Sequence, residues 1–254
     1  MTSESPDVPS ARPQAFAALR LRGYRAHFIT YVLAMMADNI EHVISYWVAF
    51  QKFHSPALGG FAVLSHWLPF LAFSVGVGAL NDRFDARRII QAGMALFITA
   101  SLGWGYFFVT DSLTMGGAML LLVLHGCAGV LWQTSSQVLL HDIVGPALLP
   151  SAVRLNATAR YLGVLVGPAV GGLIMLTLGT KRGIFLNTVF YLPLLLWLRL
   201  RLIYRLLLDP RPERPSFAST GSSRGEALYH AWTKLGFAER SPSRGGLGTL
   251  PGSP

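Results

Sequence analysis

Long apolar runs separated by short polar connections dominate the chain between residues 26 and 208. Each run has about 20 residues or more, the length that an α-helix needs to cross a hydrocarbon core of about 30 Å. Only helices or closed barrels satisfy their backbone in lipid, and these runs are too long and too evenly apolar for barrel strands. The pattern therefore predicts an all-α, polytopic membrane protein, a bundle of six transmembrane helices. We expect the spans at residues 26–50, 57–80, 89–109, 113–134, 155–178 and 183–203.

The segments outside these runs differ in character. Residues 1–25 are polar and Pro-rich and end in a short basic amphipathic lead-in, which predicts a cytoplasmic tail without a cleaved signal peptide. The connection 135–154 mixes apolar and charged residues, which indicates an interfacial helix and a turn, broken at Gly145. Residues 209–254 are rich in Pro, Gly, Ser and Arg, which predicts a disordered tail that resembles translation out of frame.

Composition supports a membrane location and excludes several classes of site. The chain is 52% hydrophobic and 13% charged, whereas a soluble domain carries about 25% charged residues. Its net charge of +9 suggests nucleic acid, but the basic residues lie at the ends of apolar runs and not on one polar face. A single cysteine, Cys127, excludes an intramolecular disulfide and a cysteine-based metal cluster. We expect no nucleic-acid partner, no cofactor and no metal site.

The basic residues also predict the orientation of the bundle. With the N-terminus inside, the outer loops hold only Lys52, Lys181 and Arg182. The inner segments hold Arg12, Arg20, Arg22, Arg25, Arg83, Arg87, Arg88, Arg154, Arg160, Arg199, Arg201, Arg205, Arg211 and Arg214. Positive charge concentrates on the cytoplasmic side of membrane proteins, so both ends of the chain are predicted to be cytoplasmic, in a bacterial inner (plasma) membrane.

A charged turn between the second and third runs is the first motif that indicates a mechanism. It contains Gly78, Asp82, Arg83, Arg87 and Arg88. Asp82 can accept hydrogen bonds from backbone amides at a neighbouring helix end, and the arginines can pair with acidic groups or lipid phosphates. Such a network can hold one state of a bundle and break in another. The alternative is that the arginines only fix the topology.

The second motif is a run of small residues in the fifth span. Gly163, Gly167 and Gly171 recur every four positions and give one smooth helix face, followed by Gly172. Pro168 removes a backbone donor and bends the helix. We expect a helix on which its neighbours rock, or, alternatively, static packing through glycine.

Together these motifs resemble the major facilitator superfamily. The turn is similar to the signature between its second and third spans, and the Gly-Pro-Gly-Gly run is similar to a fifth-span signature of its antiporters. Residues 132–140 and 149–156 resemble the branch that contains the enterobactin exporter, and the whole resemblance covers about residues 16–208. Asp85-Ala86 departs from the family's usual Gly and basic residue. The resemblance implies twelve spans in two similar halves, of which this chain holds the first six.

A third constellation lies in the first span, where Asp38, Glu41 and His42 share one helical face. An ionisable residue near mid-membrane costs about 2.5–3.5 kcal/mol on insertion scales, so it usually faces protein or water. We expect Asp38 and Glu41 to form part of a proton or cation relay with His42 as partner; the alternative is a satisfied buried network. His66 and His125 are weaker candidates for the same pathway.

Arg160, near the inner end of the fifth span, either caps its helix or contacts an anionic substrate. The favoured function is secondary active transport of small molecules, a proton-coupled export of a drug-like or siderophore-like compound. Because alternating access needs two bundles, the chain is expected to be a truncated half that requires a second half-transporter or a dimer partner. The alternatives are a non-transporting membrane interaction protein or inactive fragment on a half-carrier scaffold and, with less support, an intramembrane hydrolase, for which no Gly-x-Ser-x-Gly elbow is present.

Overall fold

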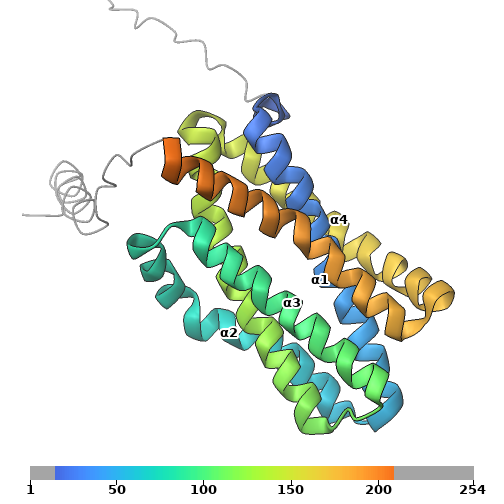
Figure 1. Cartoon of the computed structure of the whole chain (residues 1–254). Helices are drawn as coiled ribbons and strands as arrows, with labels where there is room; N and C mark the ends of the chain where they lie inside the picture. Colours follow the sequence, from blue (N-terminus) through green and yellow to red (C-terminus); the bar gives the residue numbers. More distant parts are fainter. Residues whose placement is uncertain (1–14, 209–254) are drawn as a thin grey trace, which may run out of the picture. The chain divides into compact units, whose positions relative to one another are not determined.

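The computed structural model describes residues 15–208, with the side chains described up to residue 201. A short 3₁₀ helix, η1 (Ala17–Arg20), precedes four helices: α1 (Arg22–Phe53), α2 (Pro56–Arg83), α3 (Ala86–Thr110) and α4 (Met115–Leu208). Figure 1 shows these helices packed side by side along a common direction. No strand occurs in the described residues, and the predicted all-α fold is confirmed. The two predicted tails, apart from residues 15–25, lie outside the described residues.

The long helix α4 is broken at two glycines into three segments, 115–144, 146–178 and 180–208. Gly145 has φ 69° and Gly179 has φ 75°, values in the left-handed region that favours glycine. The chain reverses direction at each break (Figure 1). The described residues therefore contain six long helical segments.

The expected interfacial helix at 135–154 is not formed as a separate element, and this prediction is wrong. Helix 115–144 continues ten residues beyond the predicted end of its span, and the next helix begins directly after Gly145. Leu139 and Leu140 in this extension are fully buried, and Leu140 packs in a cluster with Ala18 and Tyr24. Packing against the start of the chain thus keeps the helix regular.

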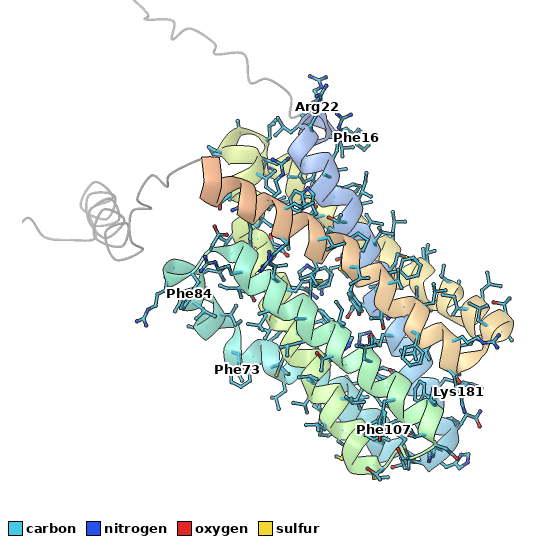
Figure 2. The ribbon with its side chains drawn as sticks, viewed as in Figure 1. Phe16, Arg22, Phe73, Phe84, Phe107 and Lys181 are labelled. Atoms are coloured by element: carbon cyan, nitrogen blue, oxygen red, sulfur yellow. The ribbon has the colours of Figure 1, made fainter. Side chains whose placement is uncertain are left out.

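Hydrogen bonds between elements that are distant in the sequence occur at both ends of the bundle. At one end, the backbone N–H of Ala18 donates to Ser151 Oγ at 3.2 Å, which ties η1 to the second segment of α4. At the other end, Lys52 Nζ donates to the carboxylate of Asp111 at 2.9 Å, which ties the end of α1 to the end of α3. In Figure 2, Arg22 is near the first end and Lys181 near the second.

The outside of the bundle is strongly apolar. Leu71, Val75 and Leu176 are more than 80% exposed, which suits a surface in contact with lipid rather than water. Three helices of the described part are long and apolar enough to cross a membrane by length and composition: Pro56–Arg83, Ala86–Thr110 and the stretch Met115–Arg201, which includes both breaks. The more polar α1 is not among them.

One face of the helix α1 packs mainly against α4, while Ile29, Trp47 and Phe50 are exposed on α1. One core cluster joins Ala34 and Met35 of α1 to Phe97 of α3 and Trp132 and Tyr191 of α4. The rings of Phe97 and Tyr191 stack with centroids 5.1 Å apart. The packed face of α1 also carries Asp38 and Glu41, which are buried inside the bundle.

Candidate functional site

The core of the bundle contains a cluster of ionisable side chains from two helices. His125, in the first segment of α4, contacts Asp38 Oδ1 through Nε2 and Glu41 Oε1 through Nδ1, both at 2.9 Å. Asp38 is 6% exposed, Glu41 1% and His125 5%. A single imidazole therefore bridges two carboxyl groups that lie on one face of α1, as their spacing predicts.

Two neutral side chains complete the surroundings of Glu41. Ser101 of α3 donates a short hydrogen bond from its hydroxyl to Glu41 Oε2. Asn187, in the third segment of α4, donates from Nδ2 to the same oxygen at 3.5 Å. Glu41 is thus held by groups from α3 and from two segments of α4, although all lie far apart in the sequence.

The charge of this cluster follows from its hydrogen bonds. Each contact between His125 and a carboxyl group holds one proton. Either an imidazolium lies between two carboxylates, or a neutral imidazole lies between a carboxylate and a carboxylic acid. Both arrangements leave Asp38, Glu41 and His125 with a single net negative charge. Among the described residues, no lysine or arginine forms an ion pair with either carboxylate.

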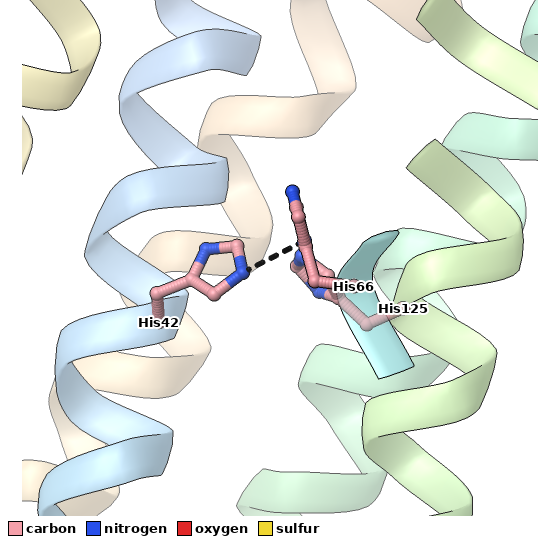
Figure 3. Close-up of side chains that lie close together, drawn as sticks. All are labelled: His42, His66 and His125. Atoms are coloured by element: carbon pink, nitrogen blue, oxygen red, sulfur yellow. Dashed lines mark hydrogen bonds between the residues drawn. The ribbon is translucent and has the colours of Figure 1, made fainter. Parts of the chain in front are cut away.

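Two further histidines extend the cluster towards α2. His42 Nδ1 lies 2.6 Å from the backbone carbonyl oxygen of Asp38, and its Nε2 lies 3.2 Å from His66 Nδ1 (Figure 3). The ring centroids of His42 and His125 are 4.6 Å apart. His42, His66 and His125 line a cavity of about 10 Å³, and Tyr46 and Trp104 line it as well. The structure therefore brings all three predicted histidines together with the two predicted carboxylates.

A local irregularity of α2 brings His66 to this position. Pro69 has no N–H, so the carbonyl of Ser65, four residues earlier, has no helical partner there. That carbonyl lies directly against Gly126, where a Cβ atom would overlap its oxygen. Only glycine permits this approach of α2 to α4. Because His66 follows Ser65 and His125 precedes Gly126, the contact also holds these two histidines beside each other.

The predicted turn between α2 and α3 has a different arrangement from the one expected. Asp82 lies in the last turn of α2 and is exposed, and the residue that caps α3 is Asp85, whose Oδ1 accepts from the backbone N–H of Arg87 at 2.9 Å. Because α2 extends to Arg83, Phe84 and Asp85 form the connection, and the contact expected between Asp82 and a neighbouring helix end stays a prediction.

The other residues of the turn motif are distributed over both helices. The Arg87 guanidinium lies 3.4 Å from Asp85 and is largely buried, whereas Arg83 and Arg88 are exposed. A Cβ on Gly78 would meet nothing within 4 Å, so this glycine makes no close helix contact in the described residues. The pair of Asp85 and Arg87 is local, whereas Asn81, at the start of the turn, donates to Ser135 Oγ of α4 at 3.0 Å.

The glycines of the fifth predicted span pack against α1. Cβ atoms on Gly163, Gly167 and Gly171 would press on Met35, Asn39 and Val43 respectively, in register every four residues. This interface supports the helix that carries Asp38 and Glu41.

Three predicted residues lie away from the ionisable cluster. Gly172 has open space around it, and Pro168 is exposed. Arg160 is half-buried and shares no hydrogen bond with the cluster in the part of the chain that the structure describes. Sequence analysis missed Ser101 and Asn187, for which the only signal is a polar residue inside an apolar run.

Comparison with known proteins gives matches of one kind. The family model of the Major Facilitator Superfamily matches residues 27–246. A tetracenomycin C resistance and export protein from Streptomyces glaucescens is 28% identical over 191 residues, which are 74% of this chain and 35% of that protein. A putative multidrug resistance protein, MdtD, from Salmonella typhi is 29% identical over 121 residues, 48% of this chain and 25% of that protein. The chain thus spans about a third or less of the length of these relatives.

Proposed function

This chain belongs to the major facilitator superfamily, and on that premise we propose that it forms one bundle of a proton-coupled exporter of drug-like compounds. It is an integral, multi-pass membrane protein of a family that transports small molecules and does not act as enzymes. The observation that carries the finer proposal is the buried cluster of Asp38, Glu41 and His125.

The position of this cluster supports a role in energy coupling. Ionisable groups inside a membrane bundle are costly, about 2.5–3.5 kcal/mol each at the helix centre, and they commonly mark ion and proton pathways. An apolar core would stabilise the bundle without that cost. The three groups share two protons among four hydrogen-bonding atoms, and one further proton neutralises their net charge. The cluster can therefore alternate between a charged and a neutral state.

A neutral cluster and a charged cluster favour different surroundings, and this difference couples protons to the position of the bundle. The charged form favours a state open to water, whereas the neutral form tolerates a closed one. The titratable groups that face the cluster are His42 and Tyr46 of α1 itself, His66 of α2 and Tyr191 of α4.

The names of the two relatives support the class of substrate and the direction of transport. One is named for the export of tetracenomycin C and the other for multidrug resistance. We propose export of apolar, drug-like molecules through a path beside α1, with a siderophore-like compound as the second candidate. The N-terminus is proposed to be cytoplasmic, in a bacterial inner membrane, because Arg22, Arg83 and Arg87 belong to the same end of the bundle (Figure 1).

Alternating access requires a second bundle that rocks against the first. We propose that it comes from a second copy of the chain, from another half-transporter or from further sequence of a longer protein. The half-buried Arg160 then belongs to the substrate path between the bundles. The turn from Gly78 to Arg88 then belongs to the contacts that change between the two states of the transporter.

Transport in liposomes tests this function. The full chain is reconstituted and its oligomeric state measured by native mass, and release of a fluorescent aromatic drug or a catecholate siderophore is followed with and without a pH gradient. Drug movement that depends on the gradient is expected from a dimer or from the chain combined with a second half. Asp38→Asn and Glu41→Gln are expected to lower this dependence at least tenfold, because neither amide exchanges a proton.

Asp111→Asn is the matched control, since it changes an exposed carboxylate outside the cluster. Unchanged gradient-driven transport in both cluster variants would remove proton coupling at this site. A well-folded chain that moves neither compound, alone or with a second half, would favour the non-transporting membrane protein.

A further inference from the structure

Three histidines from three helical segments meet at the cavity in the middle of the bundle. His42 comes from α1, His66 from α2 and His125 from the first segment of α4 (Figure 3). One ring nitrogen of each lies within 4.8 Å of the other two. His125 is buried and the other two are partly buried, so bulk water has little access to these nitrogens.

The hydrogen bond of His42 leaves one nitrogen ready to bind a cation. Its Nδ1 faces the carbonyl oxygen of Asp38, which can only accept, so Nδ1 is the nitrogen that carries the proton. In the neutral ring, Nε2 then has a free lone pair, and it points towards His66. Histidines that bind metals almost always donate their other N–H to a backbone carbonyl or a carboxylate in this way.

The spacing of the nitrogens matches that of ligands on a small metal ion. Two ligands at about 2.0–2.1 Å from a tetrahedral ion lie about 3.3–3.4 Å apart. His42 Nε2 and His66 Nδ1 are 3.2 Å apart. The adjoining cavity of about 10 Å³ has space for about one water molecule beside them.

The charges around the histidines also favour a cation. Asp38, Glu41 and His125 together carry one net negative charge, and no lysine or arginine among the described residues pairs with either carboxylate. Glu41 accepts from His125 Nδ1, the arrangement of an outer carboxylate that orients a metal-bound imidazole. A divalent ion with neutral imidazoles and these two carboxylates would form a neutral group.

We propose that His42, His66 and His125 form a binding site for a divalent transition-metal ion of the Zn²⁺ type. Imidazole nitrogen suits Zn²⁺, Co²⁺ and Ni²⁺, whereas Mg²⁺ and Ca²⁺ prefer oxygen ligands. His125 exchanges its Nε2 contact with Asp38 for the metal, and the proton shared in that contact is released to water. His125 keeps its Nδ1–H contact with Glu41, and a water completes the coordination. The site ties α2 to α1 and α4, and it does not depend on the proposed export function.

No metal site was expected from the sequence, because the single cysteine excludes a cysteine-based cluster and a lone histidine in a membrane span is more often hydrogen-bonded to a neighbouring helix. The site depends instead on the approach of α2 to Gly126, which brings His66 beside His125. The ligands lie at positions 42, 66 and 125 and belong to no common local pattern.

Binding of Co²⁺ to the full-length protein in detergent or nanodiscs tests the proposal. Four-coordinate Co²⁺ has intense visible d–d bands that six-coordinate Co²⁺ lacks, so both affinity and geometry are measured. One Co²⁺ per chain with these bands, displaced by Zn²⁺ but not by Mg²⁺, is expected. His66→Gln and His42→Gln should weaken binding by at least about tenfold, since even outer partners of metal sites contribute 10–100-fold.

His141→Gln is the matched control, because His141 is an exposed histidine of α4 outside the cluster. The affinity of this variant for Co²⁺ should equal that of the unaltered protein. Size-exclusion profiles identify any variant that fails to fold. If His42→Gln fails to fold, the Co²⁺ affinity of His66→Gln alone decides whether the site exists, since His66 makes no hydrogen bond to Asp38 or Glu41. Absence of the bands in the unaltered protein, or equal affinity in His66→Gln, would overturn the metal site. Neither result bears on proton coupling, which the liposome assay measures separately.

Discussion

The ionisable cluster in the core and the charged turn between α2 and α3 contain the same kinds of residues in opposite settings. In the core, Glu41 and Asp38 are bridged by His125, which is more than 80 positions away in the sequence. In the turn, Asp85 is bound by Arg87, two residues away. The first set joins separate helices, whereas the hydrogen bond between Asp85 and the Arg87 backbone caps the start of α3. The two regions therefore differ in what their contacts join and not in exposure, since Asp85 and Arg87 are about as buried as Asp38.

Removal of the bridging imidazole should have the largest effect. In His125→Ala, the two carboxyl groups lose their shared partner, and we expect the free energy of unfolding to fall by about 3–5 kcal/mol, the cost of breaking a buried ionic pair. Thermal unfolding in nanodiscs measures the change.

A second substitution sharpens this test. Asp38→Asn combined with His125→Ala removes one of the unbalanced carboxylates and should recover part of the loss. His141→Ala should change stability by less than about 0.5 kcal/mol because it is exposed. An unfolding midpoint of His125→Ala equal to that of the unaltered protein would mean that the core cluster stabilises no more than the turn does.

The approach of α2 to the cluster gives the next largest effect. In Gly126→Ala, the new methyl group would overlap the carbonyl of Ser65, and backbone atoms cannot move aside as a flexible side chain would. We expect a loss of about 1–3 kcal/mol, typical of an overpacked core, together with weaker Co²⁺ binding.

Gly78→Ala is the matched control from the other region. It is also a glycine within α2, but a Cβ there meets nothing within 4 Å. Alanine should stabilise the helix by about 0.5–1 kcal/mol. If both variants lose stability equally, the close contact at Gly126 is not what holds α2 in place.

The turn should respond to substitution on a smaller scale. Asp85→Ala removes the side chain that caps α3 and is expected to cost at least about 1 kcal/mol, because it also takes the carboxylate away from the buried Arg87. Asp82→Ala, three residues earlier and exposed, should cost less than about 0.5 kcal/mol. Unfolding curves of the two variants, measured side by side, distinguish the residue that caps α3 from the exposed residue in the last turn of α2.

The smallest effect is expected at the far end of the bundle, where Lys52 pairs with Asp111. The hydrogen bond from Lys52 lowers the pKa of the exposed Asp111 carboxyl below its ordinary value. The contact therefore stabilises the fold above that ordinary pKa and is lost as the pH falls through the lowered value.

Lys52→Met should accordingly lower the unfolding midpoint slightly at neutral pH and not at all in strong acid, where the carboxyl is neutral. Screening by salt should remove the same small difference, because the pair is exposed. A difference that persists in acid would assign the effect to packing of the lysine stem instead.

The six helical segments were predictable because each depends on a local pattern. A long apolar run predicts a helix wherever it lies, and Gly145 marks a break wherever the chain must turn. The spacing of Gly163, Gly167 and Gly171 likewise indicates a face for close approach, although it does not say that α1 is the partner.

The failures of prediction arose where a neighbour far along the chain decided the outcome. Helix 115–144 extends past its expected end because Leu140 packs against Tyr24. Ser101 and Asn187 were missed because only the packing of α3 and α4 against α1 brings them to Glu41.

The sequence by itself determined that this protein is helical and apolar outside, and that Asp38, Glu41 and His42 share one face of α1, since these properties follow from residue type and period. Only the tertiary structure decided that His125 bridges Asp38 and Glu41, and that His66 joins His42 beside them. These groups meet because a carbonyl left free by Pro69 fits against Gly126, a contact between backbones that no pattern along one helix specifies.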